Sequence, residues 1–222
     1  MLRLGGRVKN TFFLFLISSF LFSAHAQYPT HWWKPVPKED LKWWEISPDS
    51  AKKGEVVLSK RNELGLLSNF AATPFVFRKK KYPSLEGLWQ SMKYPESKSD
   101  PRFSKAEWPF TRAEVEKMDG HTAKKAGGFG SKVMKKMGIN WVTFEGVEMV
   151  YRTSEKSDHY QVIKEAMLSK LNQNPKVKQT LLATGSLNLR PDHKVRADDP
   201  PAWRYYQIWM DIRRDLQKGD SH

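Results

Sequence analysis

The clearest pattern of apolar and polar residues lies in the segment 83–93. Pro83 interrupts any preceding helix and Ser84 is a favourable N-cap residue, so a helix is predicted to begin at position 85. Its apolar side chains recur at helical spacing and form one stripe: Leu85, Leu88, Trp89 and Met92. The segment therefore predicts a short helix that packs one face into the core.

A row of polar residues runs along the same helix. Glu86, Gln90 and Lys93 fall at i, i+4 and i+7, so their side chains share a face beside the apolar stripe. Two interpretations of this face remain open. It forms the wall of a pocket, or it is a solvated surface with a hydrogen bond between residues four apart.

Extended segments are predicted near the start of the same region. Residues 55–58 and 74–77 read as strands, and the second is expected to be buried on both faces because its apolar residues alternate poorly. The basic run 78–81 that follows is expected to form a hairpin turn.

Capping residues mark further helices. Thr111 and Glu114 form a capping-box pattern, and Thr122 is expected to cap a short helix that ends at Gly127-Gly128. The turn from Gly127 to Gly130 then either caps that helix or offers backbone amides to a phosphate. Longer helices are predicted at 158–171, at 175–182 after the cap Asn174, and at 201–216 after the cap Asp199.

These elements predict an α+β fold, a single compact domain that is mostly helical around a small sheet. We expect this domain to span residues 53–218. Its predicted core comprises Leu85, Leu88, Trp89, Met92, Val162, Met167, Leu181, Leu182, Ile208 and Ile212.

Two segments precede the domain. Residues 1–26 have the pattern of a signal peptide, with early basic residues, an apolar run at 12–22 and the cleavage motif Ala24-His25-Ala26. A membrane anchor is the alternative, but the apolar run is shorter than a span requires, so no stable membrane insertion is expected. Residues 27–52 combine four tryptophans with four prolines, which predicts an irregular arm whose indoles dock on the domain surface or stack on carbohydrate.

Charge and residue content narrow the classes of function. The net charge of +14 falls to about +11 without the leader, which favours phosphate-bearing substrates, nucleic acid or an anionic surface. The chain has no cysteine, so disulfides and a cysteine nucleophile are excluded. Its six histidines are scattered, and no dinucleotide-binding glycine pattern occurs. We therefore expect neither a metal nor a cofactor.

The order of several short motifs resembles the NADAR or YbiA-like family of N-glycosidases. The motifs are Leu67-Ser68-Asn69-Phe70, the run from Tyr82 to Lys93, Gln173-Asn174-Pro175 with Leu181-Leu182-Ala183-Thr184-Gly185, and Ile208 to Arg213. This resemblance implies a compact α+β domain that hydrolyses N-glycosidic bonds. In some members the substrates are riboflavin-pathway intermediates, and in others they are ADP-ribosylated bases.

Catalytic residues follow from this resemblance. N-glycoside hydrolysis passes through an oxocarbenium-like state, so it needs a carboxylate near the anomeric carbon and a donor for the leaving base. Glu86 is the expected first carboxylate. The family places a second acid before the last helix, where Asp192, Asp198 and Asp199 lie. Asp192 is favoured, because an N-cap role already explains Asp199 and no packing role explains Asp192.

The expected substrate-binding residues are Asn69, Phe70, Gln90, Lys93 and Trp141. Trp141 matches a family tryptophan that stacks in the substrate pocket, and a stacked ring contributes about 1–3 kcal/mol per base; a core position is its alternative. Asn69 is expected to offer its amide to ribose or base edges, unless it is simply a turn residue.

Two stretches near the expected site depart from the family's pattern. An insertion-like stretch, 144–158, separates Trp141 from the next helix, and Trp203-Arg204-Tyr205-Tyr206 replaces the family's Asn-Leu-x-Gly entry to the last helix. The substrate is therefore not carried over from the family.

Two hypotheses of different kinds remain. The first is an exported hydrolase, periplasmic or extracellular, that cleaves N-glycosidic bonds of nucleotide-like anionic small molecules of the ADP-ribosyl or riboflavin-pathway type without metal or cofactor. The second is a secreted basic binding module with the same fold and no turnover, which binds nucleotide or nucleic-acid ligands.

Overall fold

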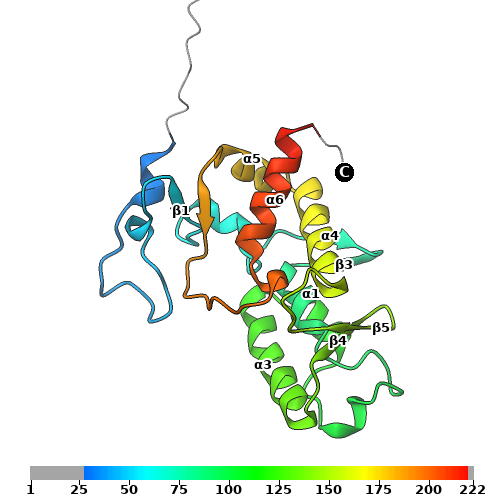
Figure 1. Cartoon of the computed structure of the whole chain (residues 1–222). Coiled ribbons are helices and arrows are strands. Elements are labelled where there is room, and N and C mark those ends of the chain that lie inside the picture. The colour runs from blue at the N-terminus through cyan, green and yellow to red at the C-terminus, as the bar shows by residue number, and fades with distance from the viewer. Residues whose placement is uncertain (1–27, 220–222) are drawn as a thin grey trace, which may run out of the picture.

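Helices supply most of the regular structure in residues 28–219, the part of the chain that the computed structural model describes (Figure 1). The α-helices are α1 (Leu85–Ser91), α2 (Arg112–Glu116), α3 (Gly120–Met137), α4 (Asp158–Gln173), α5 (Pro175–Ala183) and α6 (Tyr205–Gln217). The short 3₁₀ helices are η1 (Thr30–Trp33), η2 (Pro48–Ser50), η3 (Glu63–Leu67), η4 (Phe103–Lys105) and η5 (Pro201–Trp203). The predicted leader, 1–26, lies outside the described residues.

The strands form separate two-stranded pairs. They are β1 (Glu55–Val57) parallel to β6 (Asn188–Arg190), β2 (Phe75–Phe77) antiparallel to β3 (Lys80–Tyr82), and β4 (Trp141–Phe144) antiparallel to β5 (Val147–Val150). The predicted single compact α+β domain is confirmed, with these small pairs in place of one small sheet.

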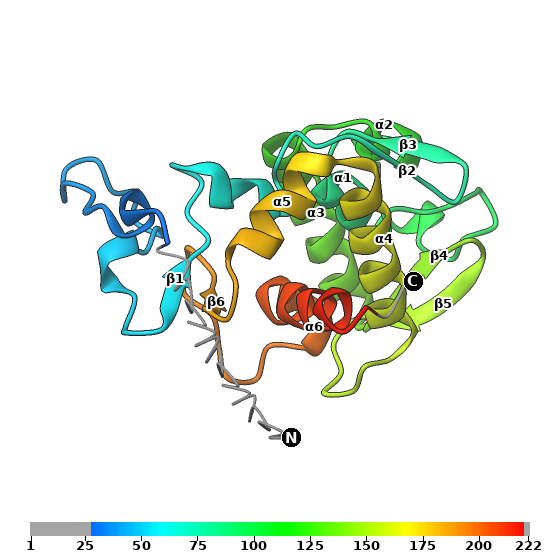
Figure 2. The ribbon, with the colours of Figure 1, turned by 90° about the horizontal axis from the view of Figure 1, so that it is seen from above.

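The helices pack around one main core. Helix α1 contacts α3 on one side and α4 on another, and α5 contacts both α4 and α6 (Figures 1 and 2). Eight of the ten predicted core residues are buried there, and Val162 is partly buried against this core. Leu182 was predicted to be buried and this is wrong, because α5 turns Leu181 inward and leaves Leu182 39% exposed.

The segment before β1 packs against the β1–β6 pair, where Figure 2 shows it as the blue end of the described chain. Trp32 is buried and its Nε1 donates to Glu63 Oε1 at 2.6 Å. The Trp33 Nε1 donates to the carbonyl of Glu55 at 2.9 Å. These indoles dock on the domain as predicted, whereas Trp43 is 94% exposed.

The β2–β3 hairpin differs from the sequence prediction in one respect. Phe75 and Phe77 are buried, but Val76 between them is 48% exposed, so the strand alternates and is not buried on both faces. The turn itself consists of Arg78 and Lys79, both with positive φ. The lysines that follow belong to β3.

Helix α3 runs without a break from Gly120 to Met137, so the predicted stop at Gly127-Gly128 and the predicted amide turn are wrong. Its N-cap is Asp119 rather than Thr122, since Asp119 Oδ1 accepts from the backbone N–H of His121 and of Thr122. Gly127 and Gly130 serve packing instead.

Two of these glycines bring α3 close to α1. A Cβ at Gly127 would lie 1.6 Å from Gln90 Oε1, and a Cβ at Gly130 would lie 2.8 Å from Lys93 Cβ. A methyl group at either position collides with the polar row of α1. The absence of side chains therefore lets α3 cover Gln90 and Lys93.

The other predicted caps have mixed outcomes. Ser84 accepts from the backbone N–H of Gly87 at 3.1 Å, and Thr111 forms the complete capping box with Glu114, as predicted. Asp199 is not an N-cap, which corrects the sequence prediction. Its Oδ2 accepts from the Arg196 N–H at 2.9 Å, and α6 begins only at Tyr205, after η5.

The glycines of α3 provide a matched pair of substitutions. Gly128 is exposed with no atom near its added Cβ, so Gly128→Ala should raise the free energy of unfolding by about 0.5–1 kcal/mol through helix propensity. Gly127→Ala should instead lower it by about 1–3 kcal/mol through overpacking. Urea unfolding of both variants measures the difference, and similar effects would contradict the close α1–α3 contact.

Candidate functional site

A cavity of about 550 Å³ lies between α1, α3 and the segments that precede α1 and α6. Helix α1 contributes its polar row and Trp89, and α3 contributes Lys124, Ser131, Met134 and Lys135. The rest of the wall comes from Lys60, from the segment at Ser68–Phe70, from Ile139 and Asn140 after α3, from Tyr151 and Arg152 after β5, and from the segment 193–205. Residues far apart in the sequence thus meet at one hollow.

The polar row of α1 forms one wall of this cavity. Glu86, Gln90 and Lys93 are each at most 4% exposed, so the row is a pocket wall and not a solvated face. The Gln90 Nε2 donates to Glu86 Oε1 at 2.7 Å, which is the predicted contact between residues four apart. The carboxylate is therefore held in place from its own helix.

Glu86 carries a carboxyl group whose pKa is shifted by its surroundings. Burial raises the pKa of Glu86 above its ordinary value, because desolvation penalises the charged form. The positive charges of Lys124, Lys93 and Lys60 and the hydrogen bond from Gln90 oppose this shift. The Lys124 ammonium, 3.9 Å from Glu86 Oε1, is itself largely exposed. The carboxyl group can therefore hold a proton closer to neutral pH than an exposed glutamate can.

Lys93 continues the row two residues after the end of α1. Burial lowers the pKa of its ammonium to about 8, while the nearby Glu86 carboxylate acts in the opposite direction. Its Nζ donates to Ser131 Oγ at 3.0 Å and lies 5.1 Å from the centre of the Tyr151 ring. The ammonium thus remains available for an anionic group in the cavity.

The segment before α1 supplies Asn69 and Phe70. The Asn69 carbonyl accepts from the Glu86 backbone N–H at 2.9 Å, which joins this segment to the start of α1. The Asn69 Oδ1 is buried and has no hydrogen-bond partner within the described residues. The Phe70 ring lies 5.4 Å from Lys60 Nζ. Both residues line the cavity, and an unsatisfied acceptor there is available to a ligand.

The three candidates for the second carboxylate have different surroundings. Asp192 is buried but does not line the cavity. Its two oxygens contact Lys60 Nζ at 2.5 Å and His193 Nδ1 at 3.1 Å, and both of those partners do line it. Asp198 is exposed and pairs with Arg196. Asp199 lines the cavity and is partly exposed.

The pKa of Asp192 reflects its role as an ion-pair partner. Desolvation acts to raise this pKa, but the hydrogen bond with His193 and the charge of Lys60 outweigh it, so the pKa lies below the ordinary value. Asp192 therefore remains a carboxylate that orients Lys60 and His193 from behind the cavity wall.

The structure does not bring Trp141 to the cavity. Its ring instead lies 4.6 Å from the Arg102 guanidinium, in a cation–π contact. Arg102 is fully buried and pairs with Asp100. The chain position that the resemblance assigns to substrate stacking is thus taken by a structural contact.

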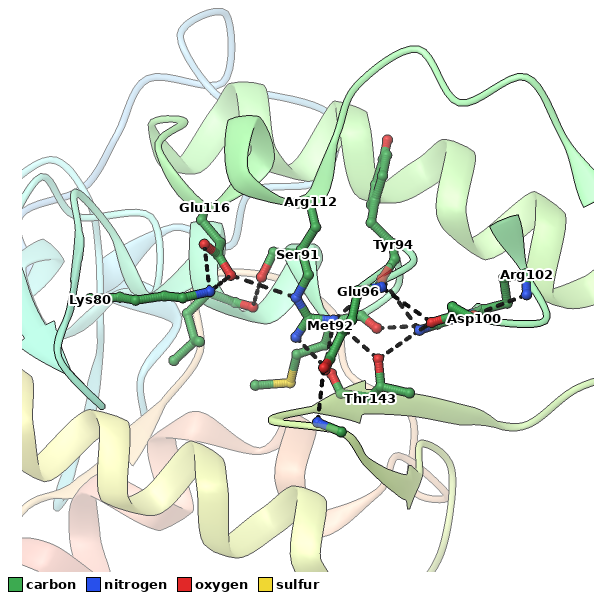
Figure 3. A network of polar contacts seen from close by, with 12 residues as sticks. Lys80, Ser91, Met92, Tyr94, Glu96, Asp100, Arg102, Arg112, Glu116 and Thr143 are labelled. Atoms are coloured by element: carbon green, nitrogen blue, oxygen red, sulfur yellow. Dashed lines mark hydrogen bonds and ion pairs between the residues drawn. The ribbon is translucent and has the colours of Figure 1, made fainter. Parts of the chain in front are cut away.

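Arg102 and Arg112 belong to a buried polar network at the end of α1 (Figure 3). Arg102 Nη1 donates to the carbonyl of Met92 at 2.9 Å, and both arginines donate to the carbonyl of Tyr94 at 3.3 Å. Both also donate to Thr143 Oγ1. Cations at a helix C-terminus are favourable because they complement its dipole. The network therefore fixes the end of the helix that carries the polar row.

Several residues that line the cavity were not predicted from the sequence to belong to the site. They are Lys60, Lys124, Lys135 and Arg152 among the cations, and Trp89, Tyr151, Trp203 and Tyr205 among the aromatic residues. Tyr151 and Arg152 come from the insertion-like stretch 144–158, and Trp203 and Tyr205 come from the altered entry to α6. For these four residues, the departures from the family's pattern were the available signal.

Two features are absent from residues 28–219, a cluster of metal-binding side chains and a membrane-spanning helix. These residues include no group of three His, Asp or Glu side chains placed to hold a metal ion. None of the helices in this part of the chain is long and apolar enough to cross a membrane.

Comparisons with known proteins add a likeness to one solved structure. No protein-family model matches the chain. No curated protein matches it either. Among solved structures, the chain is similar to the NMR structure of the E. coli protein YbiA, with 19% sequence identity and a TM-score of 0.48. The match covers 82% of this chain and 94% of the other.

Proposed function

We propose that this chain is an exported hydrolase that cleaves N-glycosidic bonds of nucleotide-like anionic substrates. The observation that carries the proposal is Glu86, a buried carboxyl group with a raised pKa in the wall of a cavity whose other charged groups are mostly cations. Perturbed carboxyl groups in clefts are typical of acid–base sites. The motif resemblance described above supports the same class of reaction.

The lining of the cavity offers groups for both the phosphate end and the base end of a nucleotide-like substrate. Lys93, Lys124, Lys135 and Arg152 provide positive charge for phosphate groups. Aromatic rings at Phe70, Trp89, Tyr151, Trp203 and Tyr205 provide flat apolar surface for a base. The volume of about 550 Å³ falls within the usual range for small-molecule sites.

The chemistry assigned to this site is hydrolysis through an oxocarbenium-like state. The bond between the anomeric carbon and the base nitrogen breaks, water delivers its oxygen to that carbon, and the base leaves with a proton. Glu86 stabilises the positive carbon or takes the proton of the attacking water. Asp199 is the proposed second carboxylate because it faces the cavity, whereas Asp192 positions Lys60 and His193.

Glu86→Gln tests the mechanism, since it keeps the shape of the side chain and removes the charge. Turnover should fall by about 10²–10⁴-fold, the usual range for a positioned acid–base group. The free energy of unfolding should stay equal or rise, because a desolvated carboxylate is lost. The assay is release of free base from a panel of nucleotides, flavin precursors and ADP-ribosylated compounds.

Two aspartate variants serve as comparisons for this test. Asp199→Asn should lower turnover, and Asp192→Asn should mainly lower stability, because it leaves Lys60 without its buried carboxylate. The reverse pattern would make Asp192 the catalytic partner. Unchanged turnover in Glu86→Gln would remove the mechanism, and binding without turnover by the native protein would leave a binding module with this fold.

The pKa of Lys93 predicts a pH dependence. Because its ammonium loses its proton near pH 8 in the folded protein, affinity for a phosphate-bearing ligand should fall as the pH rises through that value. The pKa of Lys93 is lower in the folded protein than in the unfolded chain, so the unfolded chain binds more protons than the folded protein between about pH 8 and pH 10.5. The free energy of unfolding should therefore rise with pH across this window. Lys93→Met should abolish the pH trend in affinity, as measured by calorimetric titration with ADP-ribose, and should reduce the pH trend in the free energy of unfolding, as measured by urea unfolding. An affinity trend that persists unchanged in Lys93→Met would assign it to another group.

The predicted export can be tested by determining where the mature protein begins. The leader pattern predicts cleavage after Ala26, so the exported protein should begin at Gln27. Amino-terminal sequencing of the protein recovered outside the cytoplasm checks this. Recovery of the uncleaved chain in a membrane fraction would contradict export as a cleaved protein.

A further inference from the structure

Lys170 of α4 is a fully buried lysine without an acidic partner. Its side chain is 0% exposed, and no carboxylate of the described residues forms an ion pair with it. Its Nζ donates to the backbone carbonyl of Ser68 at 2.8 Å. Burial lowers the pKa of this ammonium to about 7. An ammonium in such a place is costly, and an apolar residue of similar size would fill the space without that cost.

The carbonyl that Lys170 contacts lies in the segment that faces the cavity. Three successive carbonyls of this segment each accept a hydrogen bond from a different helix. Leu67 accepts from Trp209 Nε1 of α6 at 2.7 Å, Ser68 accepts from Lys170 of α4, and Asn69 accepts from the Glu86 N–H of α1 at 2.9 Å. The backbone of residues 67–69 is therefore fixed from three directions.

This arrangement determines how the segment meets a ligand. The carbonyl of Ser68 and the N–H of Asn69 belong to one planar peptide unit, so the contact with Lys170 orients both. The Asn69 Oδ1 lies buried without a partner, and the Asn69 carbonyl is joined to the first turn of α1, which carries Glu86. A rotation of this peptide would move the Asn69 amide and loosen the start of α1.

We propose that Lys170 is a positioning residue of the site, which holds the Ser68–Asn69 peptide so that Asn69 and Glu86 face the substrate. The assignment of a substrate rests on the proposed function, but the positioning itself does not. The Ser68 carbonyl also accepts from the Ala71 N–H at 3.2 Å, so it keeps a partner when the ammonium is removed.

Lys170→Met tests this role, because methionine keeps most of the side-chain volume and removes the donor. Hydrogen exchange should become faster at the amides of Ala71 and Glu86, which donate to the Ser68 and Asn69 carbonyls, while amides of α3 and α6 stay unchanged. The melting temperature should stay equal or rise, since an uncompensated buried charge is lost. Met167→Leu on the same helix is the control, because it exchanges one apolar side chain for another.

Ligand binding gives a second, separate readout with ADP-ribose as the probe. If the native protein binds it, Lys170→Met should weaken binding by about tenfold or more, because small displacements of site groups have large effects. Unchanged exchange in the segment 67–71, or faster exchange throughout the domain with a lower melting temperature, would overturn the positioning role. Failure of the native protein to bind ADP-ribose would count against this choice of substrate, and the exchange experiment would still decide the role of Lys170.

Discussion

The close contact between α1 and α3 is the constraint on which the site depends. Gln90 lies against Gly127, and Lys93 lies against Gly130, at distances that no side chain larger than hydrogen allows. This contact removes the polar row of α1 from water. Burial then raises the pKa of Glu86 and lowers that of Lys93, so the perturbed charges of the cavity are a consequence of helix packing.

A short helix with buried charges needs support at both ends. At its start, Ser84 caps α1 and Glu86 lies in the first turn, where a negative charge complements the helix dipole. At its end, the guanidinium groups of Arg102 and Arg112 bind the carbonyls of Met92 and Tyr94. Because both ends are held, α1 and the turn that follows it can present Glu86, Gln90 and Lys93 in a fixed geometry.

Local patterns could be predicted from the sequence, and tertiary contacts could not. The row of Glu86, Gln90 and Lys93 depends on helical spacing alone, so its shared face was evident. Gly127 and Gly128 were wrongly predicted to end a helix, because glycine is typical both of helix ends and of close contacts between helices. Trp141 was misplaced because its partner Arg102 lies 39 positions earlier in the sequence, where no pattern connects the two.

The position of Lys170 in α4 could have been recognised from the sequence as unusual. It falls three residues after Met167, on the stripe of α4 that also holds Ile163 and Ala166, so a charged residue occupies an apolar position of the helix. Charged residues are rarely buried without a partner. A lysine on an apolar stripe therefore points to a carbonyl or carboxylate inside the fold, although its identity required the structure.

The segment before β1 contacts residues that line or support the cavity. The Ile46 N–H donates to the Asp192 carbonyl at 2.8 Å, and the Trp44 ring lies 5.1 Å from Lys60 Nζ. Lys60 is thus held between this segment and the Asp192 carboxylate, which neutralises it. Lys135 of α3 and Arg152 line the same cavity, and the Arg152 guanidinium lies 4.6 Å from the centre of the Trp203 ring. Under the proposed function, these two cations are the groups that meet the anionic end of the substrate, beside an aromatic ring on which its base can stack.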